Sequence, residues 1–363
     1  IMAGAVAGAA AVALVATWTT TVVDAHKAKI SPFTYNKEIF PLLRDKCGRC
    51  HTDGGPAPMS LMTYNTDGGA VAWAESIREM LLSGTMPPWY ADPTGPAVRN
   101  NHALTARELD TIITWAIGGT PHGDLTVKIP PVPARTGWSL GKPDVELPMP
   151  AAYTVPDNVM QASTEVEIPT NLTEVKWVKA VDLLPGTVSM VRRAYIRVDG
   201  GPLLALWEPG DDVTPAPSGA AFKLMPGARL KVKIDYKKSW MDEQKSVSDK
   251  STVGLYFTEE PLAGKAVETV TIDGPAGSDG LEPRSFGGAM PKAGRVFAVT
   301  PMLDDPYATV EINAVAASGR KVPLLKLRNA RPEWPRRYWL VDPIELPANT
   351  KIEVTAVPSD PDT

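Results

Sequence analysis

The chain opens with an uncharged, apolar run: residues 1–23 carry no charge before Asp24. As a helix this run would be roughly 35 Å long at ~1.5 Å per residue, enough to cross a bilayer. Gly4 and Gly8 form a G-x-x-x-G spacing, which allows close packing against another helix. We therefore expect residues 1–25 to form a transmembrane anchor, with a cleaved signal peptide as the alternative.

Apolar positions then recur with a helical period between residues 33 and 123. A first helix is expected from Pro41 toward Cys47, because proline fits the first turn of a helix. A second follows from the apolar stripe in residues 73–81. A third begins at Thr105-Ala106-Arg107-Glu108, which has the form of a capping box. The pattern predicts a compact all-α domain.

The pattern changes from period 3.6 to period 2 after a proline-rich stretch. Residues 124–139 form the predicted linker, in which prolines favour an extended spacer. Beyond it, apolar and polar side chains alternate in short runs, of which the clearest is Leu230, Val232, Ile234 and Tyr236. Such runs between Pro and Gly turns indicate antiparallel sandwiches. We predict two β-sandwich domains, residues 140–262 and 263–363.

The helical region contains the motif Cys47-Gly48-Arg49-Cys50-His51. This C-x-x-C-H spacing is the attachment signature of a c-type haem, in which two thiols form thioethers and the histidine ligates the iron. The alternatives are a zinc site or a redox-active dithiol. Cys47 and Cys50 are the only cysteines, so no second pair exists to complete a zinc site. We therefore predict one covalent haem c.

The second axial iron ligand is expected from Met86, in the loop Ser83-Gly84-Thr85-Met86-Pro87-Pro88-Trp89. A methionine thioether there could reach the distal face of the haem and would raise its reduction potential. His102 is the alternative, although a polar loop residue is its simpler interpretation. Surface positions are expected for His26 and His122.

Composition limits the classes of function. A length of 363 residues favours two or three domains. The formal charge of −4 and the pI near 5.7 argue against nucleic-acid binding. The cluster of Arg192, Arg193 and Arg197 could bind an anionic group or an acidic partner, but a solvated strand edge is the simpler interpretation.

The region from Tyr35 to Gly123 resembles a bacterial family of single-haem cytochrome c domains. The resemblance is carried by CGRCH, GGPAP, MPPWYADP and TARELDTIITWAIGGTP. It implies a class I cytochrome c-like fold, and it implies His51 and Met86 as axial ligands. In that family the domain often precedes a copper-dependent monooxygenase-like module.

The remainder of the chain resembles the copper type II, ascorbate-dependent monooxygenases, the group of peptidylglycine and dopamine hydroxylases. The similar stretches are GWSLGKPD (137–144), LPG (184–186), TVGLYF (252–257) and EWPRRY (333–338). The resemblance implies two jelly-roll sandwiches. Arg192-Arg193 and Asp235 stand where copper-binding histidines would be, and no histidine follows His122. Copper sites of that type need imidazole ligands, so we expect no copper and no hydroxylase activity.

Together these features predict a multidomain electron carrier rather than an enzyme. The predicted protein is a monohaem subunit on the periplasmic side of the bacterial inner membrane, anchored by one helix within a respiratory or photosynthetic complex. Its β module would serve docking or assembly with other subunits. The alternatives are a structural subunit with a non-essential haem, and an oxidoreductase with a substrate site in the β module.

Overall fold

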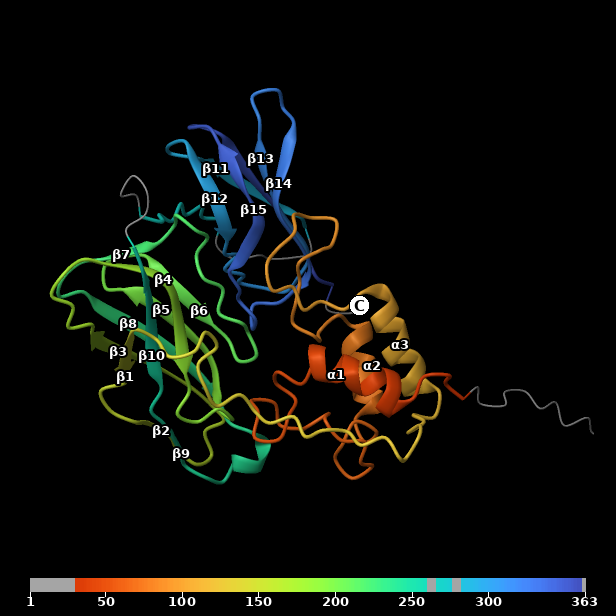
Figure 1. Cartoon of the computed structure of the whole chain (residues 1–363). Coiled ribbons are helices and arrows are strands. Elements are labelled where there is room, and N and C mark those ends of the chain that lie inside the picture. Colours follow the sequence, from red (N-terminus) through yellow and green to blue (C-terminus); the bar gives the residue numbers. More distant parts are fainter. Residues whose placement is uncertain (1–29, 260–265, 276–281, 361–363) are drawn as a thin grey trace, which may run out of the picture.

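The computed structural model describes residues 30–259, 266–275 and 282–360. Of these residues, 34% lie in strands and 11% in helices, so the molecule is mainly β. Figure 1 shows the helices gathered beside two groups of strands, which we call the first and the second β unit.

The helices are few and short. They are a π-helical turn η1 (Tyr35–Ile39) followed by α1 (Phe40–Lys46), then α2 (Ala74–Leu82) and α3 (Ala106–Ile117). Their common core contains the fully buried Tyr35, Ile39, Leu43, Ile112 and Trp115. The capping box at the start of α3 is present: Thr105 accepts a hydrogen bond from the Glu108 backbone N–H, and the Glu108 carboxylate accepts one from Thr105.

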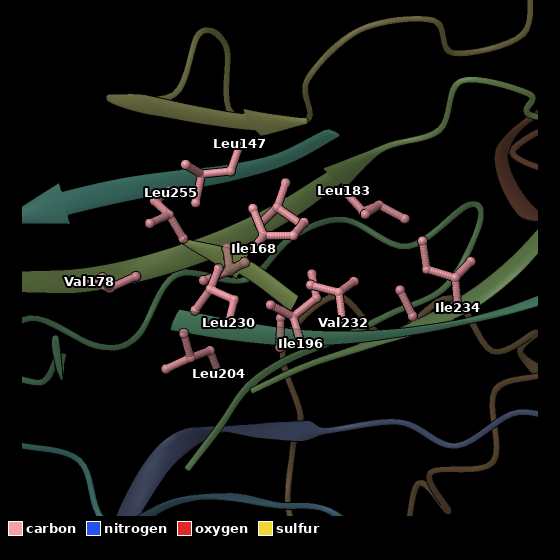
Figure 2. Close-up of a cluster of buried hydrophobic side chains, with 14 of the residues drawn as sticks. Leu147, Ile168, Val178, Leu183, Ile196, Leu204, Leu230, Val232, Ile234 and Leu255 are labelled. Atoms are coloured by element: carbon pink, nitrogen blue, oxygen red, sulfur yellow. The ribbon is translucent and has the colours of Figure 1, made fainter. Parts of the chain in front are cut away.

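The first β unit contains two four-stranded antiparallel sheets, in the orders β3-β8-β5-β6 and β1-β10-β4-β7. Both sheets contribute to one core, in which Leu230, Val232 and Ile234 of β8 are fully buried (Figure 2). A two-stranded pair, β2-β9, lies beside them. The strands are β1 (Val145–Pro148), β2 (Tyr153–Val155), β3 (Gln161–Pro169), β4 (Lys176–Leu184), β5 (Val191–Val198), β6 (Leu203–Trp207), β7 (Phe222–Leu224), β8 (Arg229–Lys237), β9 (Val247–Asp249) and β10 (Thr252–Thr258), with a 3-10 turn η2 (Trp240–Asp242) before β9.

The second β unit contains a four-stranded antiparallel sheet, β11-β16-β13-β14, and a two-stranded pair, β12-β15. Its strands are β11 (Arg284–Ala289), β12 (Gly294–Val299), β13 (Tyr307–Val315), β14 (Lys321–Ala330), β15 (Tyr338–Leu346) and β16 (Lys351–Pro358). Tyr90, Ala91 and Val98, from the segment between α2 and α3, are buried in the same core.

The prediction of an all-α, class I cytochrome c-like domain was wrong. Between α2 and α3 the chain leaves the helices and joins the second β unit, through isolated bridges from Ala91 to Leu327 and from Val98 to Leu340. The backbone N–H of Arg99 also donates to the carbonyl of Trp339 at 2.8 Å. These backbone groups are satisfied by strands, not by helix, so three short helices are all that the region forms.

The predicted single-pass membrane placement also needs correction. The longest described α-helix, α3, has 12 residues, whereas a membrane-spanning helix needs about 20. Within the described ranges no helix is both long and apolar enough to cross a membrane. The expected anchor itself, residues 1–25, lies outside the described residues.

Candidate functional site

The Cys47–His51 motif continues α1 as a helical turn. The backbone N–H of Cys47 donates to the Leu43 carbonyl at 2.8 Å, which carries the helix into the motif. The N–H groups of Cys50 and His51 then both donate to the Cys47 carbonyl, at 3.0 and 2.8 Å. Residues three and four positions apart in such a turn share one face. The two thiols and the imidazole are therefore brought to the same side of the chain.

Both cysteines are free thiols and partly buried. Burial raises the pKa of Cys47 to about 12 and that of Cys50 to about 12. A redox-active C-x-x-C pair depends on the opposite shift, toward a reactive thiolate. The dithiol alternative therefore finds no electrostatic support in this environment.

Cys50 lies against the first β unit. Its sulfur is 3.5 Å from the carbonyl oxygen of Pro209. It approaches Gly210 so closely that a Cβ added there would lie 2.6 Å from the sulfur, and Gly210 has a φ of +79°. A glycine is needed at this position both for the left-handed backbone and for the approach of the thiol.

Burial lowers the pKa of the His51 imidazole and so favours its neutral form, against a weaker opposing effect of the Met59 backbone. Its Nδ1 atom is buried without a hydrogen-bond partner among the described residues. Its backbone carbonyl accepts from the Leu61 N–H at 3.0 Å, which fixes the chain on leaving the motif. A neutral imidazole is the form that ligates a metal.

This donor set fits a covalently bound haem. Two thiols and one imidazole within one helical turn are what c-type attachment requires, and the porphyrin would supply the remaining ligands of the iron.

The predicted metal-binding character needs correction for a metal ion that protein side chains alone would hold. Among residues 30–259, 266–275 and 282–360, no three His, Cys, Asp or Glu side chains are grouped so as to hold a metal ion.

Met86, the predicted second axial ligand, lies in the loop after α2 and is partly buried. Its backbone N–H donates to the Met80 carbonyl at 3.2 Å. The same loop is held from the second β unit by Arg336, which donates to the Pro88 carbonyl at 2.7 Å and covers the Trp89 ring at 3.7 Å. The loop is thus fixed in place, and the role of Met86 stays a prediction.

The other described histidines have partners of their own. The His102 ring packs edge-on against Trp89 with centroids 4.7 Å apart, and its Nε2 lies 3.5 Å from Asp212. His122, expected at the surface, packs instead edge-on against Tyr64, with centroids 4.2 Å apart. His26 lies outside the described residues.

A network of charges joins the motif to the two β units. Around Asp212, the Arg49 guanidinium lies at 2.8 Å and that of Arg135 at 2.9 Å. The nearby side chain of His102 first, and then those of Arg49 and Arg135, hold the pKa of Asp212 far below its usual range. The motif, the linker and the first β unit therefore meet at one carboxylate.

A second, more deeply buried group lies beside it. Arg336 is 6% exposed; its Nη2 is 2.9 Å from Glu208, which is 1% exposed, and 3.2 Å from Asp211. The sequence analysis missed these residues. The turn after β6 contains Glu208, Asp211 and Asp212, and it has neither a helical nor a strand pattern. Arg336 lies about 125 residues further along the chain.

The three arginines that we expected to form one cluster at a strand edge lie in different environments. Arg193 donates to Asp235 at 2.5 Å, and Arg197 is exposed. Arg193 lies in the stretch 191–195, and Asp235 on a later strand, where the resemblance leads us to expect copper-binding histidines; the two residues form an ion pair with each other. Arg192 is partly buried, and its Nη1 has no hydrogen-bond partner in the described part of the chain.

Comparisons with known proteins add no assignment. No model of a known protein family matches the chain, and no curated protein matches it. Among solved structures, one of oxalate decarboxylase, from work on the Mn(II) centres of the Bacillus subtilis enzyme, shares 10% identity over 67% of this chain and 86% of its own, with a TM-score of 0.10. A second oxalate decarboxylase structure shares 10% identity over 64% and 85%, also with a TM-score of 0.10. Such scores carry no argument about fold or chemistry.

Proposed function

We propose that the chain is a monohaem electron carrier, with haem c attached to Cys47 and Cys50 and its iron ligated by His51. One observation carries the proposal: the helical turn after α1 contains two free thiols and a partly buried imidazole whose pKa is lowered by burial. The spacing is that of c-type attachment. The haem, when bound, supplies one-electron chemistry between ferrous and ferric iron.

Attachment needs no oxidant. Each thiol would add across one vinyl group, so that the S–H bond and the vinyl π bond would break while a C–S and a C–H bond would form. Cys47, Cys50 and His51 would then hold the cofactor at two sulfurs and one nitrogen. The electron comes from a reduced protein partner and passes to an oxidised one; respiratory or photosynthetic electron-transfer proteins are the partners we propose. The β units would provide their docking surface, without copper.

The first test is covalent haem attachment. We expect the wild-type chain, expressed with a c-type haem maturation system, to carry one haem that survives denaturing electrophoresis and appears in its intact mass. Each single Cys→Ser variant at Cys47 or Cys50 should retain at most one thioether, which shifts the pyridine haemochrome spectrum. The double variant should hold no covalent haem. An unmodified wild-type mass, or covalent haem in the double variant, would contradict the proposal.

The second test concerns Met86. We expect Met86→Leu to keep covalent haem, to lose the weak far-red band of sulfur-ligated ferric iron, and to have a lower reduction potential, because a Met ligand raises that potential. Met80→Leu is the matched control, since Met80 is 40% exposed on α2. If Met86→Leu keeps both the band and the potential of the wild-type protein, another side chain is the ligand.

A further inference from the structure

We propose that a buried carboxyl pair, Glu208 and Asp211, takes up one proton when an electron reaches the haem site, so that the chain carries a proton together with its electron. The inference rests on the proposed function, because it requires the haem. It gives the turn after β6 a direct part in the electron transfer, in addition to docking.

The turn that carries the two carboxyl groups packs directly on the haem-attachment motif. The Cys50 sulfur is 3.5 Å from the carbonyl oxygen of Pro209, the residue after Glu208. The Arg49 guanidinium donates to the carbonyl of Gly210 at 3.2 Å. A charge in this turn therefore lies close to the cysteine that would carry the haem. Charges interact more strongly there than in water, because the protein interior screens them less.

One guanidinium serves both carboxyl groups. Arg336 Nη2 lies 2.9 Å from Glu208 and 3.2 Å from Asp211. The other oxygen of Glu208, Oε1, is buried and accepts no hydrogen bond from any described residue. Two carboxylates beside one cation leave an excess of negative charge, and a buried charged oxygen without a donor is costly. The geometry therefore favours one proton on the pair, at Oε1 of Glu208.

A small cavity borders both the carboxyl pair and the motif. Its volume is about 40 Å³, and its wall contains Glu208, Asp211 and Arg49. A space of that size has room for roughly two or three water molecules. The Glu208 side chain is 1% exposed, whereas that of Asp211 is 20% exposed. Asp211 and the cavity therefore give a proton from the solvent a path to Glu208.

The other groups around Glu208 keep their charge near neutral pH. Arg193 of β5 is paired with Asp235. Burial raises the pKa of the three phenols that act on Glu208, those of Tyr90, Tyr195 and Tyr338. Cys50 would carry no charge as a thioether. In the same turn, Asp212 is kept ionised by three basic side chains, those of His102, Arg49 and Arg135.

Glu208 differs from these groups. Burial raises its pKa to about 8, opposed by Arg336 and aided by Asp211. An electron at the haem site adds negative charge nearby, which raises the pKa of an acid further and so favours the protonated carboxyl. Linkage makes the effect reciprocal, because the proton then favours the ferrous state by the same factor.

Electron and proton have separate sources. The electron comes from the reduced protein partner and turns ferric into ferrous iron. A hydronium ion of the solvent gives up the proton, which forms an O–H bond at Oε1 of Glu208. Both leave again on oxidation.

The test is a redox titration of the full chain with its covalent haem between about pH 6 and 10. We expect the equilibrium constant for reduction to fall around pH 8 by up to tenfold per pH unit, which is about 59 mV for one electron. Reduced-minus-oxidised infrared spectra should show a carboxylic-acid C=O band that moves in D₂O. Glu208→Gln should remove this band and flatten the titration. Glu165→Gln, at an exposed position of β3, should change neither.

Asp211→Asn provides a second variant. It removes the negative charge that helps to raise the pKa of Glu208, so the pH dependence should move to lower pH without disappearing. A wild-type potential that does not change with pH, a band that survives Glu208→Gln, or an Asp211→Asn titration identical to that of the wild-type protein would overturn the proton uptake and leave the electron carrier standing. Absence of covalent haem from the wild-type chain would overturn the proposed function, and this inference with it.

Discussion

Replacing Arg336 by methionine is expected to lower the free energy of unfolding by about 3–5 kcal/mol, the usual result of removing one partner from a buried ion pair. Arg336 lies between Glu208 and Asp211, in a site where its own side chain is 6% exposed and that of Glu208 is 1% exposed. Without the guanidinium, the Asp211 carboxylate and the buried carboxyl of Glu208 would have no cation between them. The loss is measured by chemical denaturation of the holoprotein.

Two further variants make this result interpretable. Arg295→Met removes an exposed arginine of the same β unit, whose partner Glu345 is also exposed; a surface pair of that kind contributes roughly 0–1 kcal/mol. At a pH above about 8, where Glu208 is ionised, combining Arg336→Met with Glu208→Gln should recover part of the loss, because one buried charge disappears with its partner. If Arg336→Met costs no more than Arg295→Met, the site is solvated and not a buried network.

Arg336→Met should also affect the loop that carries Met86, the predicted iron ligand. Arg336 donates to the Pro88 carbonyl and covers the Trp89 ring, and both residues follow Met86 in its loop. Loss of these contacts frees the loop that carries the thioether. We therefore interpret Arg336 as a positioning residue, by which the second β unit holds the loop that carries Met86.

Local patterns in the sequence predicted local structure well. The capping box at Thr105 begins α3 as expected, because both of its hydrogen bonds lie within one turn. The alternation from Leu230 to Tyr236 is that of β8, where these apolar side chains are buried and Lys231 and Lys233 are less so. The Cys47–His51 motif follows α1 as a helical turn, whose hydrogen bonds also join residues close in sequence.

The tertiary relations could not be predicted in this way. The segment between α2 and α3 was assigned to a helical domain, but Ala91 and Val98 pair with strands more than 200 residues later. Arg192 was assigned to a solvated strand edge because a bulge leaves no signature in an alternating pattern. The turn that carries Glu208 and Asp212 has no recognisable sequence pattern. Its importance follows from its contacts with the motif and the linker in the folded chain. Each error arose where distant partners, rather than neighbours in sequence, determine the environment.

Stability should fall as the pH rises through neutrality, and Glu208 is the reason. Burial raises the pKa of Glu208 to about 8; Arg336 opposes this rise and Asp211 adds to it. One guanidinium lies between the two carboxylates, so a single proton on the pair relieves their repulsion. In the unfolded chain the same carboxyl has its ordinary pKa, near 4.5.

The sign follows from the protons bound in each state. Between about pH 5 and 8 the folded state keeps a proton on Glu208 that the unfolded state has lost, so the free energy of unfolding decreases with pH. The slope for one proton is at most about 1.4 kcal/mol per pH unit. Asp212 acts in the opposite direction: its depressed pKa stabilises the fold above its unfolded value near 3.8, and that contribution is lost only in more acidic solution.

Glu208→Gln isolates this effect, because the amide keeps the shape of the side chain but cannot ionise. We expect denaturation midpoints of the wild-type protein to fall from pH 5 to pH 8, and those of Glu208→Gln to stay nearly level. Glu165→Gln is the control, since Glu165 lies on β3 as an exposed carboxylate and should leave the wild-type profile unchanged. A Glu208→Gln profile as steep as that of the wild-type protein would contradict the prediction, because the pH dependence would then not come from Glu208.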